Sequence, residues 1–157
     1  MAATPLLDLS RIDLNKLVVT REEIYAKLPH RYEFMQLDGI IHIDVAERVA
    51  VGLRVVREDE FWVKGHIPGR PLMPGVMIIE TAAHMASFLS QAVQPTEHFL
   101  GFGGVDGVKF RGAVVPPARM YVLVKGIDVR PRRTICDAQG IVDGKLVFEA
   151  RITGMPF

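Results

Sequence analysis

The stretch that decides the fold reads GHIPGRPLMPGV at residues 65–76 and continues as MIIETAAHMA at residues 77–86. Three glycines and three prolines make its first part a stiff loop. Its second part, continued to Ala92, is apolar around nearly the whole circumference of a helix, and a helix of that kind is buried. We therefore expect a central helix over residues 76–92.

Strand-forming segments stand on both sides of this helix, rich in valine and isoleucine and separated by turn residues. They span residues 35–43, 48–56, 61–63, 100–115, 120–128 and 133–142. A last segment, 145–153, follows Asp143 and Gly144, the signal of a two-residue type I′ hairpin. One long helix among antiparallel strands predicts an α+β fold in which the sheet wraps round the helix.

The N-terminal part divides into an arm and the start of the domain. The apolar residues of the arm are placed so that one side can dock on the domain: Leu6, Leu7, Leu9, Ile12, Leu14 and Leu17. Thr20 and Glu23 have capping-box spacing, which predicts a short helix over residues 20–28. We expect an arm at residues 1–20 and one domain at residues 21–157.

The composition is that of an ordinary globular domain, with 157 residues, 24% charged residues and a net charge of +1. That charge attracts neither nucleic acid nor an anionic membrane, so we expect neither as a partner. The uninterrupted apolar runs fall short of the ~18 residues that span a bilayer, and residues 1–15 do not resemble a signal peptide. The single cysteine, Cys136, excludes an intrachain disulfide and a thiolate metal cluster. We expect a cytoplasmic protein without stable membrane insertion.

His66 in the loop and Glu80 in the helix are the two groups that proton transfer requires. An unperturbed imidazole titrates near pH ~6.5, so His66 suits a base. A solvated carboxyl group is ionised at neutral pH, so Glu80 suits an acid only if burial among its apolar neighbours raises its pKa. Two structural interpretations stay open: His66 hydrogen-bonded to backbone, and Glu80 paired with His84 four residues on.

Four blocks of the sequence carry a resemblance to a known family. They are LPHRYEFMQLD at residues 28–38, GHIPGRP at 65–71 with MPGV at 73–76, IETAA at 79–83, and GVD at 104–106 with KFR at 109–111 and VVP at 114–116. They resemble the β-hydroxyacyl-acyl carrier protein dehydratases of fatty acid synthesis and extend over most of the chain from residue 28 onward. Within the first block we interpret His30 and Arg31 as scaffold.

The resemblance implies the hotdog fold and a hydro-lyase that dehydrates (3R)-hydroxyacyl-acyl carrier protein to trans-2-enoyl-acyl carrier protein. It implies that His66 and Glu80, 14 residues apart (80 minus 66), are the catalytic pair. It also implies a homodimer or a trimer of dimers, in which His66 of one subunit meets Glu80 of the other. The substrate is carried on the phosphopantetheine of acyl carrier protein, so we expect no metal and no other cofactor.

In that reaction His66 takes the proton next to the thioester carbonyl, and Glu80 gives a proton to the departing hydroxyl. Charge that develops on the thioester oxygen needs a donor, and the start of a helix offers unpaired N–H groups. We therefore predict that Gly75 and Val76 bind the substrate there. His84 stands where the family usually has glutamine. It is predicted either to contact the substrate or to donate a hydrogen bond that keeps Glu80 ionised.

Two questions stay open in the sequence. Six basic residues of the later half are either solvated strand faces or a docking patch for acidic carrier protein: Lys109, Arg111, Arg119, Arg130, Arg132 and Arg133. The alternative functions are a hotdog acyl thioesterase, in which Glu80 positions water, and a weakly active dehydratase-like partner subunit. The preferred acyl chain length is not predicted.

Overall fold

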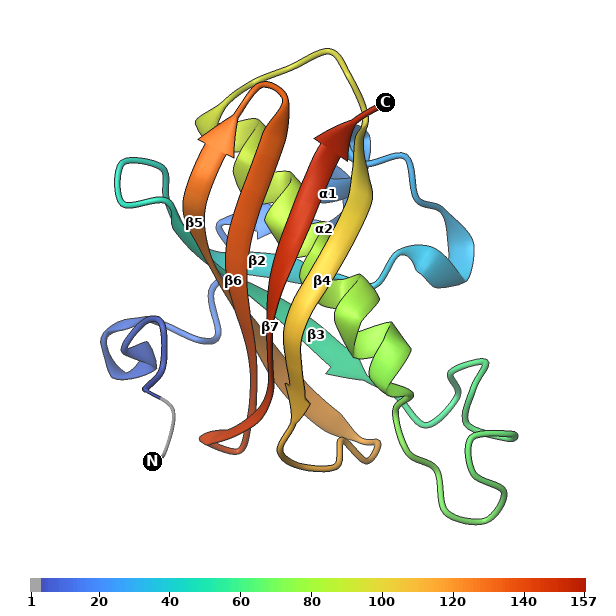
Figure 1. The fold of residues 1–157 in the computed structure, drawn as a ribbon. Coiled ribbons are helices and arrows are strands. Elements are labelled where there is room, and N and C mark those ends of the chain that lie inside the picture. Colours follow the sequence, from blue (N-terminus) through green and yellow to red (C-terminus); the bar gives the residue numbers. More distant parts are fainter. Residues whose placement is uncertain (1–3) are drawn as a thin grey trace.

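A long helix, α2 (Gly75–Val93), packs against one face of a seven-stranded antiparallel sheet in the computed structural model, which describes residues 4–157 (Figure 1). The strands are β1 (Val19–Thr20), β2 (Gly39–Asp44), β3 (Val49–Val56), β4 (Leu100–Phe110), β5 (Ala118–Arg130), β6 (Arg133–Val142) and β7 (Lys145–Pro156). Their order is β1-β2-β3-β5-β6-β7-β4, so β1 and β4 form the two edges. The remaining elements are the short helix α1 (Arg21–Lys27) and two 3-10 helices, Leu9–Arg11 and Tyr32–Phe34. The predicted α+β arrangement is confirmed.

Two local sequence signals have the structure that they predict. The Thr20 hydroxyl accepts from the Glu23 N–H at 3.2 Å, and the Glu23 carboxylate accepts from the Thr20 N–H at 3.1 Å, so the capping box begins α1. Asp143 and Gly144 both have positive φ, at 49° and 73°, as a type I′ hairpin turn requires. These contacts lie within a few residues of one another, which is why the sequence could predict them.

The very short strand predicted over residues 61–63 is wrong. The segment is a turn in which the Val63 N–H donates to the Glu60 carbonyl at 3.0 Å. Trp62 is buried in the main core, so this segment anchors the following loop and pairs with no strand.

The strand predicted over residues 100–115 ends earlier, at Phe110. Beyond that point the Val114 carbonyl accepts from the Met73 N–H at 2.9 Å. The segment after β4 is therefore hydrogen-bonded to the end of the loop that leads into α2.

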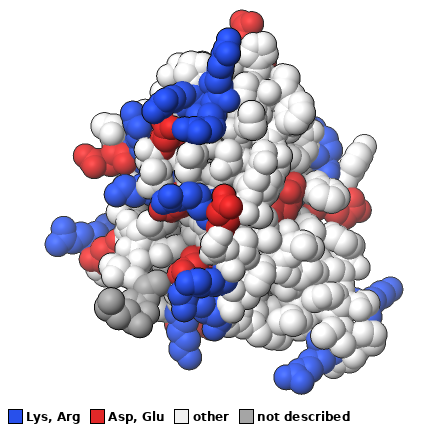
Figure 2. Space-filling model, viewed as in Figure 1, with Lys and Arg blue, Asp and Glu red and all other residues white. Residues whose placement is uncertain are grey.

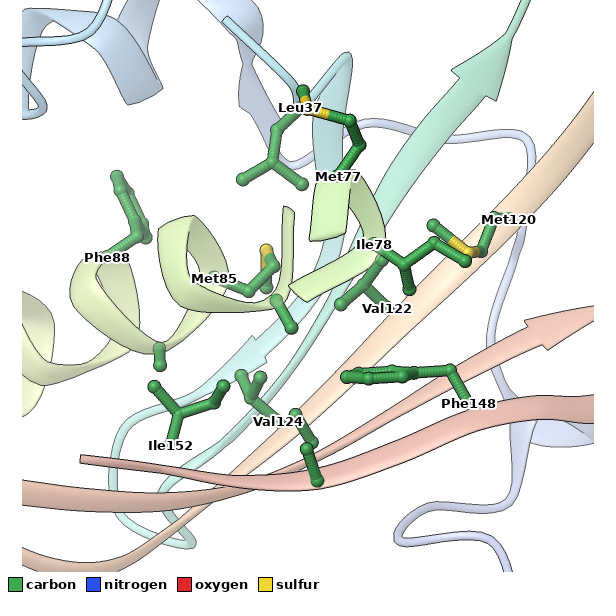
Figure 3. Close-up of a cluster of buried hydrophobic side chains, with 14 of the residues drawn as sticks. Leu37, Met77, Ile78, Met85, Phe88, Met120, Val122, Val124, Phe148 and Ile152 are labelled. Carbon is green, nitrogen blue, oxygen red and sulfur yellow. The ribbon is translucent and has the colours of Figure 1, made fainter. Parts of the chain in front are cut away.

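The main core forms where α2 meets the sheet, with side chains of both packed together (Figure 3). Its members include Leu37, Met77, Ile78, Met85, Phe88, Met120, Val122, Val124, Phe148 and Ile152. A Cβ atom at Gly52 of β3 would overlap the Met85 side chain, so a larger residue there would require Met85 to shift. By length and composition α2 would be able to cross a membrane, but 61% of its apolar 18-residue window is buried in the fold. The apolar surface of α2 is thus used in packing.

The N-terminal arm lies on the opposite face of the sheet, over a second apolar cluster. Because neighbouring residues of a strand point to opposite faces, Val51 and Leu123 reach the side away from α2. Five of the predicted arm residues pack there: Leu6, Leu7, Leu9, Ile12 and Leu14. Leu17 is 42% exposed and does not belong to the cluster. Residues 1–3 of the expected arm lie outside the described residues, and the division of the chain at residue 20 stays a prediction.

A buried ion pair joins the loop of residues 57–74 to the sheet. Arg54 of β3 is 2% exposed and donates to both carboxylate oxygens of Glu60. It also donates to the side-chain oxygen of Gln36 at 3.0 Å. The Thr81 hydroxyl, which donates to the Met77 carbonyl at 2.8 Å, lies 3.4 Å from the same oxygen. These contacts connect the start of the loop, β3 and α2.

Glu60→Ala should lower the free energy of unfolding by about 3–5 kcal/mol, because it leaves the Arg54 guanidinium buried without its carboxylate. Glu58→Ala, in the same turn but exposed, should cost less than about 0.5 kcal/mol. Urea unfolding of both variants at one protein concentration measures the difference. Equal losses would mean that the ion pair does not hold the loop to the sheet.

Candidate active site

Glu80 lies on the second turn of α2 and lines a small cavity between this helix and strands β4 and β7. The cavity has a volume of about 90 Å³, and the Glu80 side chain is 27% exposed. Two histidines and several apolar side chains line it with Glu80: His30, His84, Phe99, Phe102 and Ile152. The Glu80 carboxylate therefore faces a cavity whose wall on the side of the sheet is mostly apolar.

His84 is the immediate partner of Glu80. Its Nε2 lies 3.0 Å from Glu80 Oε1, and its side chain is 2% exposed. The hydrogen bond from His84 lowers the pKa of Glu80, and burial, which acts in the opposite direction, does not overcome it. Burial therefore raises the pKa of Glu80 less than the hydrogen bond lowers it, and the acid role, which requires a raised pKa, stays a prediction. Of the two predicted roles of His84, the geometry agrees with the donor that keeps Glu80 ionised.

His30 lies on the other side of the carboxylate, although the sequence suggested only a scaffold role. Its Nε2 is 3.8 Å from Glu80 Oε1, and its ring stacks on that of His84 with centroids 3.9 Å apart. Burial, followed by the neighbouring His84, lowers the pKa of His30 and favours its neutral form. Its Nδ1 is buried without a hydrogen-bond partner among the described residues. His30 therefore belongs to the cavity.

The ligand atoms of His30, Glu80 and His84 lie within 4.8 Å of one another, so these residues form a possible metal site. A zinc ion requires nitrogen lone pairs that converge on it at about 2.0–2.1 Å. The two imidazoles instead stack on each other, and one nitrogen of His84 is already hydrogen-bonded to the carboxylate. The arrangement favours hydrogen bonding over coordination, and the expected absence of a metal stays a prediction.

His66 is exposed, on the loop that projects beyond the start of α2 (Figure 1). Its Nδ1 lies 2.7 Å from the Leu72 carbonyl, and its own carbonyl accepts from the Leu72 N–H at 2.9 Å. Since a carbonyl can only accept, Nδ1 of the neutral ring carries the hydrogen and Nε2 keeps its lone pair. Within the described residues, the loop contributes nothing to the cavity lining. One chain therefore does not bring His66 and Glu80 together there.

Gly75 and Val76 are the first residues of α2. The capping residue, Pro74, gives no side-chain hydrogen bond, while its carbonyl accepts from the Met77 N–H at 2.9 Å. Among residues 4–157 we find no partner for the N–H groups of Gly75 and Val76, as is usual in the first turn of a helix. A Cβ atom at Gly75 would lie 2.6 Å from the Phe110 ring, so a larger residue there would require this ring to shift. Binding of substrate by these two amides stays a prediction.

The sequence model of the FabA-like domain matches residues 28–151, which include the His66 loop, α2 and most of the sheet. The chain belongs to the FabA-like family. A curated relative, the 3-hydroxyacyl-[acyl-carrier-protein] dehydratase FabZ of Aromatoleum aromaticum, is 37% identical over 137 residues, or 83% of this chain and 92% of the relative. The family resemblance of the sequence blocks is thereby confirmed.

Solved structures resemble this FabA-like protein in fold. The dehydratase heterocomplex ApeI:P from Xenorhabdus doucetiae has a TM-score of 0.72 at 13% identity, over 85% of this chain and 90% of that chain. A putative thioesterase from Ralstonia eutropha, a phenylacetic acid degradation-related protein, has a TM-score of 0.62 at 14% identity, over 74% and 82%. At such identities the likeness concerns the fold alone, and it confirms the predicted hotdog fold.

Tyr25 is a residue beside the site of this FabA-like protein that the sequence did not indicate. Its hydroxyl lies 2.9 Å from His84 Nδ1, although the two residues are 59 positions apart in the chain. No spacing rule connects positions so distant. His30, by contrast, stood within a block that resembles the family, so a signal for it was present.

Lowering the pH should destabilise the wild-type chain relative to Glu80→Gln, which cannot titrate. Because the folded-state pKa of Glu80 lies below its ordinary value of 4.5, its ionisation stabilises the fold above that pH. This stabilisation is lost as the pH falls through the folded-state pKa. Urea unfolding from neutral pH to about pH 3 measures it.

The matched control is Glu97→Gln, because Glu97 is exposed and forms no ion pair among the described residues. Its stability should follow that of the wild type throughout the pH range. Parallel curves for the wild type and Glu80→Gln would contradict a lowered pKa of Glu80.

Proposed function

We propose that this FabA-like protein is a hydro-lyase that converts (3R)-hydroxyacyl-acyl carrier protein to trans-2-enoyl-acyl carrier protein in fatty acid synthesis. The observation that carries the proposal is the family match over residues 28–151, which contains both the His66 loop and Glu80. The 37% identity to a relative named as a 3-hydroxyacyl-[acyl-carrier-protein] dehydratase supports the same substrate.

The residues fit the two proton transfers of the reaction. The bare Nε2 of His66 takes a proton from the carbon next to the thioester carbonyl. The electron pair of that bond forms the new double bond, and the hydroxyl leaves as water with a proton from Glu80. The amides of Gly75 and Val76 hold the charge that develops on the thioester oxygen. Proton transfer of this kind needs no metal and no other cofactor.

The acid form of Glu80 belongs to the assembled site. In a single chain the His84 hydrogen bond lowers the pKa of Glu80, while about a quarter of the side chain, 27%, faces solvent. A second subunit and the substrate would remove that solvent, and desolvation raises the pKa of a carboxyl group. Assembly thus supplies the burial that the acid role requires.

The edge strand β4 supports assembly into dimers. It is 11 residues long, and on its outer side no strand of residues 4–157 pairs with it (Figure 1). Phe102 and Phe110 on it are about half exposed, at 44% and 51%. A long unpaired edge with apolar side chains favours pairing with another chain. We place β4 of two copies side by side, so that His66 of one subunit meets Glu80 of the other in a homodimer or a trimer of dimers.

The six basic residues of the later half do not form one patch. Lys109 and Arg111 are paired with Glu149 at the end of β4, far along the strands from the β5–β6 turn. Near that turn, Arg130 and Arg133 pair with Asp128. Arg119 lies over the Tyr121 ring.

The β5–β6 turn is the better candidate for docking acyl carrier protein. Thr134, which follows it directly, lines the cavity of Glu80, and Arg132 forms no ion pair among the described residues. Figure 2 shows Lys and Arg side chains gathered at this end of the molecule. We propose that an acidic carrier protein docks on the turn of residues 130–133.

The cytoplasm is the compartment that we propose. The single cysteine, Cys136, lies in the main core, and burial raises the pKa of its thiol to about 12. A thiol in that state is neither a reactive group nor a disulfide partner. The fold therefore needs no oxidising environment.

His66→Ala and Glu80→Gln should each abolish dehydration of a hydroxyacyl thioester without unfolding the protein. A mixture of the two variants, refolded together, should regain activity, because the mixed dimer contains one site with both native residues. Half of randomly formed dimers are mixed and one of their two sites is intact, so about a quarter of wild-type activity is expected. Enoyl formation followed by absorbance measures it.

Each variant refolded alone is the control and should stay inactive. A mixture that forms dimers but stays inactive would contradict the shared site. Release of free thiol from an acyl thioester would favour the thioesterase alternative. A folded wild type with neither activity would favour the weakly active partner subunit.

Arg132→Glu should reduce kcat/KM for carrier-bound substrate by about tenfold at low salt, because it weakens electrostatic docking, and by less at physiological salt. Turnover of a small pantetheine-like thioester should stay unchanged. Lys109→Glu, at the other end of the strands, is the control. Equal losses on both substrates would mean that Arg132 supports the fold or the cavity instead.

A further inference from the structure

A continuous chain of hydrogen bonds connects a backbone amide to the Glu80 carboxylate. The Leu37 N–H donates to the Tyr25 hydroxyl oxygen at 2.9 Å. That hydroxyl lies 2.9 Å from His84 Nδ1, and His84 Nε2 lies 3.0 Å from Glu80 Oε1. Tyr25 and His84 are both buried, so water does not compete along most of this chain.

The chemistry of the groups decides the direction of every bond. A backbone N–H can only donate, so the Tyr25 oxygen accepts from Leu37. Burial raises the pKa of Tyr25 to about 12, so the hydroxyl keeps its hydrogen. His84 Nδ1 is the acceptor within reach among the described residues. It follows that Nδ1 of His84 is unprotonated and that Nε2 carries the hydrogen, which points to Glu80.

The opposite tautomer is unfavourable in this environment. A hydrogen on His84 Nδ1 would face the Tyr25 oxygen, and the Tyr25 hydrogen would then have no acceptor among the described residues. A buried hydroxyl without an acceptor costs about 1–3 kcal/mol. At the same time Nε2 would be unprotonated and would face a carboxylate oxygen, so that two hydrogen-bond acceptors would lie in contact without a hydrogen between them.

We infer that Tyr25 is a positioning residue for Glu80, acting through His84: its hydroxyl selects the ring tautomer that donates to the carboxylate. The inference rests on the proposed function for its effect on turnover, but the tautomer itself does not depend on that function. The groups that face Glu80 are His84 from α2 and His30 from the segment after α1. His30 is not part of this series of hydrogen bonds, because its Nε2 lies 3.8 Å from Glu80 Oε1, which is too far for a hydrogen bond.

Glutamine at position 84 separates a positioning role from a merely structural one. Its amide group has an N–H that can donate to Glu80 and no tautomers, so it does not need Tyr25 to select one. Tyr25→Phe should therefore impair catalysis when residue 84 is histidine and have no additional effect on catalysis when it is glutamine. A structural role would reduce activity equally in both backgrounds.

The experiment compares Tyr25→Phe, His84→Gln and the double variant by kcat and KM. Tyr25→Phe alone should lower kcat on the order of 10²-fold with little change in KM, as misplacement of a functional group does. His84→Gln should stay active, and the double variant should match it. Equal losses from Tyr25→Phe in both backgrounds, or an inactive His84→Gln protein, would overturn the inference.

The matched control is Tyr121→Phe. Its hydroxyl accepts from Arg119 at 3.3 Å, and its side chain packs with the second apolar cluster, away from the cavity. This variant should leave kcat unchanged. A loss like that of Tyr25→Phe would mean that removal of any tyrosine hydroxyl disturbs the site.

Nitrogen NMR of the His84 ring tests the chain of hydrogen bonds without turnover. The wild type should show one protonated nitrogen, Nε2, and Tyr25→Phe a mixture of tautomers. The carboxyl pKa of Glu80, measured by carbon NMR, should rise in Tyr25→Phe because a charge-assisted donor is partly lost. A fixed tautomer in a protein without dehydratase activity would reject the proposed function alone. An unchanged tautomer in Tyr25→Phe would reject this inference alone.

Discussion

Burial of α2 against the sheet is the constraint on which the rest of this structure depends. The helix carries apolar side chains on nearly every side, so the sheet covers it, and β3 carries Gly52 where Met85 comes close. Polar side chains of the same helix are removed from water and must find partners inside the protein. The Thr81 hydroxyl donates to the Met77 carbonyl, and His84 is hydrogen-bonded to Tyr25 and Glu80. The hydrogen bonds beside the carboxylate are therefore a consequence of how the helix is packed.

The loop with His66 is held by different forces. Trp62 and Met73 anchor it in the main core, the ion pair of Arg54 with Glu60 joins it to the sheet, and reciprocal hydrogen bonds connect His66 and Leu72. These contacts determine which nitrogen of His66 is bare. They leave the residue exposed in the single chain.

Two opposing effects act on the pKa of Glu80, and assembly with a second subunit changes only one of them. The hydrogen bond from His84 lies inside one chain and lowers the pKa of the carboxyl group. Desolvation raises that pKa, and it increases when a partner or substrate covers the exposed side. Dimerisation in the proposed site is therefore more than a way to bring in the base from the other chain. In that proposal it also favours the protonated form of Glu80.

The features that depend on neighbouring residues were predictable from the sequence: the long apolar helix, the cap at Thr20, the hairpin at Asp143, and the loop and helix that carry His66 and Glu80. It did not reveal that residues 61–63 form a turn, or that Glu80 has a lowered pKa. Nor did it indicate Tyr25 beside His84. These features follow from the folded structure. A pKa and a chain of hydrogen bonds depend on which groups from distant segments approach to about 3 Å in a buried place, and packing brings such groups together.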